Sequence, residues 1–369
     1  MRVLSLFDGI SCGYVALERA GIRIDKYYAC EIDKYAEAIS KKNYPNIERL
    51  GDVTKIDFTK LEEIDLVIGG SPCQGFSIAG KRLNFEDPRS KLFFEFVRAI
   101  RETKPKYFLL ENVVMKKEIQ DIISGILGVQ PIKINSSLLS AQSRKRLYWT
   151  NIPIVALPED KRIYLKDILE PSSAVDEKYF LSQKLVGGFL NKKGVFNGRF
   201  RPMGEGTLKS FTLTARYAKC SISDPYVYDV PYRLFNIGKG GQGSRVYDIA
   251  AKSVTLSAVG GGQGAKTGLY MVQRPRGYNK GETKFDEKCP TIGSSCWEHN
   301  NLLIDEVWGV RRLTPLECER LQTLPEKYTE YGDFNGIIKK VSDTQRYKGI
   351  GNGWTVDVIT HIFKNIPIS

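Results

Sequence analysis

The chain has 369 residues, which allows two domains or one domain that carries a large insertion. Its hydrophobic content of 42% and aromatic content of 11% are typical of a globular protein, and its net charge of +13 favours a polyanionic partner. The 7 cysteines form no C-x-x-C pair and only 2 histidines are present, which argues against a metal site and against a hydrolase with a histidine base.

The cysteines are odd in number and scattered along the chain, a pattern that predicts reduced thiols in a reducing compartment such as the cytoplasm. Met1 leads directly into strand-like residues, and no apolar run approaches transmembrane length. We therefore expect neither a signal peptide nor an association with a membrane.

The first segment reads as a strand, a glycine turn and a helix. Residues 3–6 are strand-like, residues 7–13 read F-D-G-I-S-C-G, and a helix-like run over 14–20 is closed by Gly21. The glycines let backbone N–H groups approach a ligand, as in the first βα unit of a nucleotide-binding fold. Asp8 in this turn would repel a phosphate and suit a cationic ligand.

Two further acidic residues follow strand-like runs. Glu31 ends a predicted strand over 26–30, about 20 residues past the glycine turn, where a carboxylate can bind ribose hydroxyls. Asp52 follows a strand-like run over 47–50 and could accept a hydrogen bond from an adenine amino group. These strand ends predict an adenosine-bearing cofactor, whereas a dinucleotide would require G-x-G-x-x-G, which is absent.

The run G-G-S-P-C-Q-G-F-S over 69–77 is the centre of the predicted chemistry. Residues 64–68 read as a buried parallel strand, and the glycines and the proline then break it. Cys73 is therefore expected on a turn at the carboxyl end of a strand, the edge at which open α/β sheets bind ligands. The small and basic residues 77–84 are predicted to form a mobile loop that closes over the bound substrate.

A carboxylate and two arginines complete the predicted chemistry of the first half. Apolar residues recur at helical spacing over 91–102, and a buried strand over 107–110 then ends at Glu111, on the sheet edge expected for Cys73. Arg144 and Arg146 alternate in Q-S-R-K-R, so a strand there would point both side chains to one face.

The character of the chain changes near residue 156, where glycine becomes frequent and helical periodicity fades. We predict a smaller, mostly β or irregular domain over 156–307, inserted into a domain formed by 1–155 and 308–369. The glycine-rich runs 238–245 and 260–266 lack the ending of a P-loop, so they are interpreted as loops that contact the polyanionic partner. Flexible solvated loops are the alternative.

The last stretch returns to the first domain. Thr314, Pro315 and Glu317 form an N-cap, a first-turn proline and a capping box, which predict a helix start. G-N-G at 351–353 precedes a second predicted helix over 355–364.

In their order along the chain, these motifs resemble those of the DNA cytosine-5 methyltransferases. They are F-D-G-x-x-C-G at 7–13, P-C-Q at 72–74, E-N-V at 111–113, Q-x-R-x-R at 142–146, R-R-L-T-P-x-E-C-x-R-L-Q at 311–322 and G-N-G at 351–353. Residues 92–114 look most like the de novo branch, and the compact chain looks like the prokaryotic and phage members. The resemblance implies an α/β, Rossmann-like domain that binds S-adenosylmethionine (AdoMet), with the target recognition domain in the insertion.

The resemblance also implies roles for individual residues. Cys73 would add to C6 of a flipped-out cytosine, Glu111 would hold N3, Arg146 would hold O2, and Arg144 would support the nucleophile loop or a phosphate; the base that removes the C5 proton is not assigned. Predicted cofactor-binding residues are Phe7, Asp8, Gly9, Ser11, Cys12, Gly13, Glu31, Ile32, Asp52, Val53, Gly70, Pro72, Asn352 and Thr355. Predicted DNA-binding residues are Gln74, Ser77, Lys81, Arg82, Gln242, Arg245, Gln263 and Lys266.

The predicted protein is thus a sequence-specific, monomeric DNA methyltransferase that acts on double-stranded DNA without a metal ion, with a cognate restriction endonuclease as an optional partner. Three alternatives stay open. The same chemistry could act on tRNA, as in one branch of the family; a nicotinamide-dependent oxidoreductase would need the missing glycine motif; and a non-catalytic DNA-binding relative would not need Cys73 and Glu111.

Overall fold

The computed structural model describes residues 1–71, 88–153, 156–171, 174–180, 209–210, 212–215, 217, 225–229, 235–236, 245–246 and 309–367. By their contacts the residues form two compact units. Unit 1 is Met1–Leu169, Thr207–Asp224 and Thr314–Ser369, and unit 2 is Glu170–Gly206 and Pro225–Leu313. Unit 1 therefore includes a short segment, Thr207–Asp224, from within the region that the sequence assigns to the insertion.

A seven-stranded sheet with the order β3-β2-β1-β4-β5-β7-β6 forms the centre of unit 1. Its strands are β1 (Arg2–Leu6), β2 (Lys26–Cys30), β3 (Glu48–Arg49), β4 (Leu66–Gly69), β5 (Tyr107–Val113), β6 (Ile132–Asn135) and β7 (Lys145–Thr150). β1 to β5 pair in parallel, and β7 pairs antiparallel with both β5 and β6. This sheet confirms the predicted Rossmann-like α/β domain.

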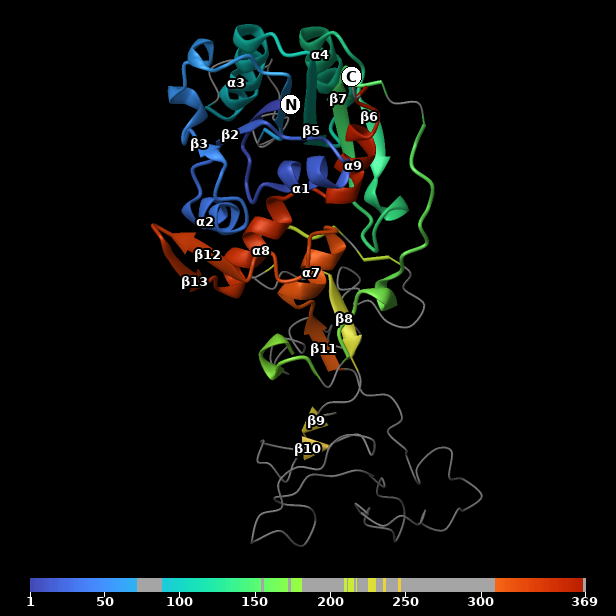
Figure 1. Ribbon diagram of the computed structural model, residues 1–369. Coiled ribbons are helices and arrows are strands. Elements are labelled where there is room, and N and C mark those ends of the chain that lie inside the picture. The colour runs from blue at the N-terminus through green and yellow to red at the C-terminus, as the bar shows by residue number, and fades with distance from the viewer. Residues whose placement is uncertain are drawn as a thin grey trace, which may run out of the picture. The chain divides into compact units, whose positions relative to one another are not determined.

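Helices cover both faces of the sheet (Figure 1). One face carries α1 (Cys12–Arg19), α2 (Lys34–Asn43) and α9 (Val356–Phe363), and the other carries α3 (Pro88–Thr103) and α4 (Lys117–Leu127). The core on the α3 and α4 side includes fully buried Phe96, Leu110 and Trp149. The last helix, α9, packs against the first helix, α1, so segments far apart in the sequence lie side by side.

The strand order changes direction beside β1, because the chain adds β2 and β3 on one side of it and β4 and β5 on the other. At such a switch point the loops that follow the two neighbouring strands turn to opposite faces, which opens a crevice at the carboxyl edge. The turn after β1 and residues Gly70 and Ser71 after β4 therefore border this crevice.

The closing segment of unit 1 contains α7 (Pro315–Leu321), the hairpin β12 (Tyr331–Phe334) and β13 (Ile337–Lys340), and α8 (Asp343–Asn352). The predicted capping box of α7 is present: the Thr314 hydroxyl accepts from the Glu317 N–H, and the Glu317 carboxylate accepts from the Thr314 N–H at 2.7 Å. The helix start predicted from the sequence is thus confirmed.

In unit 2 the described residues form two short antiparallel ladders. β8 (Tyr226–Asp229) pairs with β11 (Gly309–Arg312), and β9 (Phe235–Asn236) pairs with β10 (Arg245–Val246). Among the helices of the described chain, none is long and apolar enough to cross a lipid bilayer.

Candidate active site

The turn after β1 has an unusual backbone. Phe7, Gly9 and Ser11 all have a positive φ, of 58°, 61° and 63°. This region favours glycine, so Phe7 and Ser11 are strained and must be held by their surroundings. The Gly9 N–H donates to the Glu31 carboxylate at 2.8 Å, which ties the turn to the end of β2.

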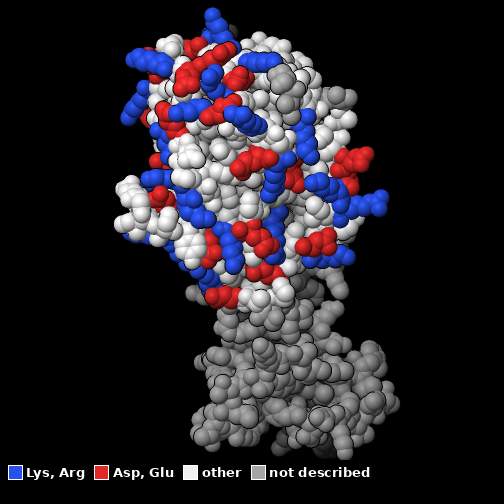
Figure 2. Space-filling view, viewed as in Figure 1, with Lys and Arg blue, Asp and Glu red and all other residues white. Residues whose placement is uncertain are grey.

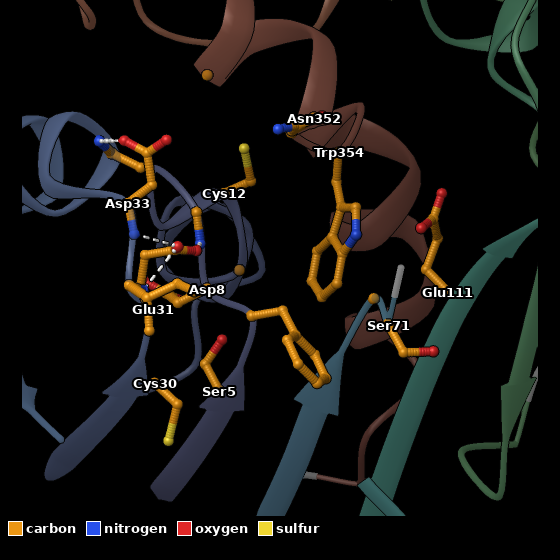
Figure 3. Close-up of a pocket in the computed structure, with 18 of the residues that line it drawn as sticks. Ser5, Asp8, Cys12, Cys30, Glu31, Asp33, Ser71, Glu111, Asn352 and Trp354 are labelled. Atoms are coloured by element: carbon orange, nitrogen blue, oxygen red, sulfur yellow. Dashed lines mark hydrogen bonds between the residues drawn. The ribbon is translucent and has the colours of Figure 1, made fainter. Parts of the chain in front are cut away.

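Glu31 is fixed by three backbone N–H groups. Its carboxylate accepts from Gly9, Ile32 and Asp33, each at 2.8 Å, as Figure 3 shows for part of the set. Asp52 is fixed in a similar way by the N–H and hydroxyl of Thr54 at 3.0 and 2.8 Å, which hold the pKa of that carboxyl below its ordinary value. Both carboxylates keep outer lone pairs for hydroxyl or amino groups of a ligand.

Asp8 is the third carboxylate of this group, and it is enclosed. It accepts from the Tyr27 hydroxyl at 2.8 Å and from the Ser11 hydroxyl. Burial raises the pKa of Asp8, although the hydroxyls of Ser11, Ser5 and Tyr27 oppose the shift.

These residues line one cavity of about 520 Å³ at the carboxyl edge of the sheet. The closing segment supplies its other wall, in which Trp354 and Asn352 lie across from the β1 turn (Figure 3). Gly70 makes the close approach possible, because a Cβ at this position would lie 3.0 Å from Trp354 Nε1 and 3.2 Å from Glu111 Oε2. Of the predicted site residues, Phe7, Asp8, Gly9, Cys12, Gly13, Glu31, Ile32, Asp52, Val53, Gly70, Glu111, Arg144, Arg146 and Asn352 line it.

Glu111 and Arg146 meet at one end of this cavity. Arg146 Nε lies 2.8 Å from Glu111 Oε1, and the two side chains are only 14% and 11% exposed. β5 and β7 are antiparallel neighbours with Val113 opposite Arg146, so the pair spans adjacent strands. A carboxyl group and a guanidinium side by side can hold the hydrogen-bonding edge of a planar ring that carries both an acceptor nitrogen and a carbonyl.

Arg144 has a different position from Arg146. Its guanidinium donates to the carbonyls of Leu213, Gly351 and Gly353 at 3.1, 3.4 and 3.2 Å, and only 6% of the residue is exposed. Burial, followed by the charge of Arg146, lowers the pKa of Arg144 to about 10. The bonds of Arg144 within the described chain thus anchor the G-N-G segment to the sheet. The role toward the nucleophile loop or a phosphate stays a prediction, since residues 72–87 lie outside the described residues.

Two predicted cofactor residues do not line the cavity. Ser11 is fully buried, with its hydroxyl bonded to Asp8 and Ser40. Thr355 is the N-cap residue of α9, and its hydroxyl donates to Gln322 at 2.8 Å. Both hydroxyls form hydrogen bonds with buried or partly buried polar groups next to the cavity, so they stabilise its wall without lining it.

Several predicted residues lie outside the described residues. They are Pro72, Cys73, Gln74, Ser77, Lys81, Arg82, Gln242, Gln263 and Lys266. Arg245 is the first residue of β10, and its side chain is not described.

Trp354 and the ion pair of Lys348 with Asp33 are features of the cavity that the sequence did not single out. Trp354 belongs to the G-N-G-W run, so its position beside a recognised motif was the available signal. Lys348 and Asp33 are 315 positions apart in the chain, and no local pattern predicts such a pair. Among the described residues there is no group of three or more histidine, cysteine, aspartate or glutamate side chains that could hold a metal ion.

Comparison with known proteins identifies relatives along the whole chain. The profile of the family described as C-5 cytosine-specific DNA methylase matches residues 1–121 and 140–367. The orphan methyltransferase M.SPRI of Bacillus phage SPR is 29% identical, with 99% of this chain and 97% of that protein aligned. The Type II methyltransferase M.HhaI of Haemophilus parahaemolyticus is 28% identical, with 100% and 95% aligned.

Solved structures share the fold at lower identity. The Entamoeba histolytica methyltransferase EhMeth is 18% identical with a TM-score of 0.64, and the alignment covers 99% of this chain and 97% of that one. The S. pombe Dnmt2 methyltransferase is also 18% identical, with a TM-score of 0.60 and the same coverage. These two similarities establish the shared fold.

Proposed function

The chain belongs to the C-5 cytosine-specific DNA methylase family, and from this premise we propose that it transfers a methyl group from AdoMet to C5 of cytosine in double-stranded DNA. The relatives that span its full length are named as phage and Type II methyltransferases, which supports DNA as the substrate. It would act at a short sequence motif, alone or beside a cognate restriction endonuclease.

The observation that carries this proposal is the Glu111–Arg146 pair at the end of the cavity, next to Gly70. In our proposal Glu111 takes up a proton from solvent as the ring replaces Arg146 as its partner, and it then donates that proton to cytosine N3, while Arg146 donates to O2. Both contacts strengthen as negative charge develops in the ring, which is the condition for lowering a barrier. Gly70 and Ser71 lead the chain directly into Pro72 and Cys73, so the nucleophile follows the cavity wall in sequence.

Cys73 would supply the covalent step. Its thiolate adds to C6 of the cytosine, which makes C5 nucleophilic enough to accept a methyl group. A base, for which water is the candidate, then takes the C5 proton as the thiolate is expelled, and this elimination restores the aromatic ring. Because C5 and C6 are inaccessible within a duplex, the cytosine must first leave the base stack.

The cavity fits AdoMet in its chemistry. Glu31 and Asp52 suit the ribose hydroxyls and the adenine amino group, and Asp8 suits a cationic end. Bound AdoMet would supply an electrophilic methyl group. The residues of this chain would orient it, with Trp354 and Asn352 closing the wall opposite the β1 turn.

Recognition of the DNA sequence is assigned, as a proposal, to the insertion over 156–307. The loop residues Gln74, Ser77, Lys81 and Arg82, together with Gln242, Arg245, Gln263 and Lys266, would contact DNA. Figure 2 shows basic and acidic side chains interspersed over the visible face of the described chain. The excess positive charge is therefore not gathered on the part of that face that the structure describes.

The test uses purified protein with AdoMet labelled in its methyl group, incubated with unmodified genomic DNA and, separately, with tRNA. We expect label in DNA, at cytosines within one short motif when 5-methylcytosine is mapped by sequencing, and no label with Cys73→Ala. Label in tRNA alone would assign the chemistry to RNA. Label that persists in Cys73→Ala would overturn the covalent step.

A further inference from the structure

The carboxylate of Asp8 lines the cavity without a cationic partner. Both of its oxygens accept hydrogen bonds, one from Ser11 and one from Tyr27, and no basic side chain in the described part of the chain forms an ion pair with it. Asp8 is partly buried, and a carboxylate that is removed from water without a counter-ion is costly to keep ionised. The structure must therefore offset this cost elsewhere if Asp8 is to receive a cation.

A line of hydrogen bonds runs from Asp8 to an arginine behind the cavity. The Ser11 hydroxyl bonds to Asp8 Oδ2 and lies 2.7 Å from the Ser40 hydroxyl, which in turn lies 3.0 Å from Arg49 Nη2. Ser11 is 0% and Ser40 is 2% exposed. Three elements contribute: the strained β1 turn, helix α2 and strand β3.

The chemistry of the end groups sets the direction of this line. A guanidinium can only donate and an ionised carboxylate can only accept, while each hydroxyl has a single proton to give. Arg49 therefore donates to Ser40, Ser40 to Ser11, and Ser11 to Asp8. Each link polarises the next, so a positive charge outside the cavity acts on a negative charge that lines it.

Arg49 is itself held in place. Its Nη1 donates to the Ile47 carbonyl at 2.8 Å and its Nη2 also donates to the Tyr44 carbonyl at 3.0 Å. A second, small cavity is lined by residues that include Asp8, Glu37, Ser40 and Arg49, which places both ends of the line beside the same space. Burial lowers the pKa of Arg49, and the negative charges of Glu37 and Asp8 oppose the shift, so the guanidinium faces both carboxylates. The guanidinium is thus fixed where it can act on Asp8 without touching a ligand in the main cavity.

We propose that Ser40 and Arg49 are positioning residues that keep Asp8 ionised and oriented, so that it can bind the cationic methionine end of AdoMet. This inference rests on the proposed function, since it assigns Asp8 to that ligand. Neither residue lines the main cavity.

The line of hydrogen bonds from Arg49 through Ser40 and Ser11 to Asp8, called the relay below, makes ligand binding depend on pH. Burial raises the pKa of Asp8, the donors Ser11, Ser5 and Tyr27 oppose the shift, and the charge of Glu31 adds to it. Cys12, Cys30 and Tyr328 also face Asp8, and all three stay neutral near physiological pH because burial raises their pKa. Binding of a cation should therefore weaken as the pH falls and Asp8 is protonated. When the relay is broken, the pH below which binding weakens should be higher than in the wild type.

The experiment compares the dissociation constants of three ligands for the full chain by calorimetry. AdoMet carries a sulfonium and an ammonium group, S-adenosylhomocysteine carries the ammonium alone, and methylthioadenosine carries neither. The variants are Ser40→Ala, which removes one link, Arg49→Met, which removes the charge, and Ser40→Thr, which restores the hydroxyl. Ser124→Ala is the matched control, a buried helical serine outside the cavity whose hydroxyl donates to Gln120 and accepts from Trp149.

We expect Ser40→Ala and Arg49→Met to weaken AdoMet binding about five- to tenfold near pH 6, to weaken it less near pH 8, and to leave methylthioadenosine binding unchanged. Ser40→Thr should recover most of the loss, and Ser124→Ala should match the wild type. An equal loss for AdoMet and methylthioadenosine, or no loss, would overturn the relay while leaving the proposed function intact. If the wild type did not bind AdoMet, both the relay and the proposed function would be refuted.

Discussion

Arg146 Nε lies 2.8 Å from Glu111 Oε1, in an ion pair between two side chains that are less than one-sixth exposed. Neither residue forms another ion pair among the described residues, although the charge of the buried Arg144 guanidinium acts on both. Breaking a buried pair leaves one charge uncompensated, which typically costs about 3 kcal/mol. The two side chains thus stabilise each other at a position where a substrate ring could form hydrogen bonds with both of them.

We expect Glu111→Gln to lower methyl transfer by about 100-fold or more, because an amide cannot give N3 a proton and the charge on Arg146 loses its partner. Arg146→Lys should also fail, since an ammonium lacks the planar fork of donors. The measurements are methyl transfer and, separately, AdoMet binding, which should change far less. Full activity in Glu111→Gln would remove Glu111 from the chemistry.

A substitution at Gly70 can show whether its close approach to Trp354 and Glu111 is required for AdoMet binding and turnover. A Cβ on Gly70 would lie 3.0 Å from Trp354 Nε1 and 3.2 Å from Glu111 Oε2, both side-chain atoms of the cavity wall. We expect Gly70→Ala to displace them, lowering AdoMet affinity and turnover while the chain stays folded.

The matched control is Gly125→Ala, in α4, where a Cβ meets nothing within 4 Å. It should raise the free energy of unfolding by about 1 kcal/mol, as glycine to alanine does in a helix, and leave turnover unchanged. Equal turnover of the two variants would show that the Gly70 approach is not needed.

Thiol reactivity should separate Cys73 from the two cysteines that line the cavity. Burial raises the pKa of Cys12 and of Cys30 to about 12, so their thiolate fractions are very small near neutral pH. We expect iodoacetamide to leave both unmodified in the native protein, as measured by peptide mass spectrometry, and loss of activity to follow modification of Cys73. Rapid alkylation of Cys12 in folded protein would contradict this.

The site was partly predictable because its carboxylates lie near the ends of parallel strands. Glu31 and Asp52 come just after β2 and β3, and Glu111 lies within the last three residues of β5, which extends to Val113 and so ends two residues later than predicted. Parallel strands bring their carboxyl ends to one edge, so local sequence was enough to place these residues together. The contacts that Arg144 makes in the described chain were not predictable in the same way. Its partners Leu213, Gly351 and Gly353 lie far along the chain, and alternation on a strand cannot tell a surface contact from a buried anchor.

The elements that the sequence analysis did not predict include a hairpin and a helix. The hairpin β12–β13 turns at Asn335 and Gly336, which have positive φ values of 56° and 85°. Asn-Gly is a strong hairpin signal, but the flanking residues lack the alternation that would have made the strands visible. Helix α4 also went unpredicted, although Gly128 ends it with a φ of 73°.

Asp8 should lower the stability of the ligand-free protein near neutral pH, although it favours ligand binding there. Because burial raises its pKa above the unfolded value of about 3.9, its contribution to stability is fully present at low pH and is lost as the pH rises. We therefore expect Asp8→Asn to raise the melting temperature near pH 7 more than near pH 4, and to weaken AdoMet binding near neutral pH. A variant less stable than the wild type near pH 7 would refute this assignment.

The ion pair of Lys348 with Asp33 joins α8 to the N-cap of α2. Both residues line the cavity, and Lys348 precedes the turn that carries Asn352 and Trp354. Burial works to raise the pKa of Asp33, but Lys348 and the N–H groups of Ala36 and Tyr35 outweigh it and hold the value below its ordinary one. The pair thus ties the cofactor-facing ends of two distant segments together.

We expect Lys348→Met to speed AdoMet dissociation by about two- to fivefold at low salt, the range for a partly exposed ion pair. Added salt should shrink this difference, because ions screen the pair in the wild type as well. Lys60→Met is the control, since it breaks a similar exposed pair with Asp57 that does not line the cavity. Stopped-flow dissociation rates that are equal for Lys348→Met and Lys60→Met, or a difference that high salt leaves unchanged, would show that the pair does not retain the ligand.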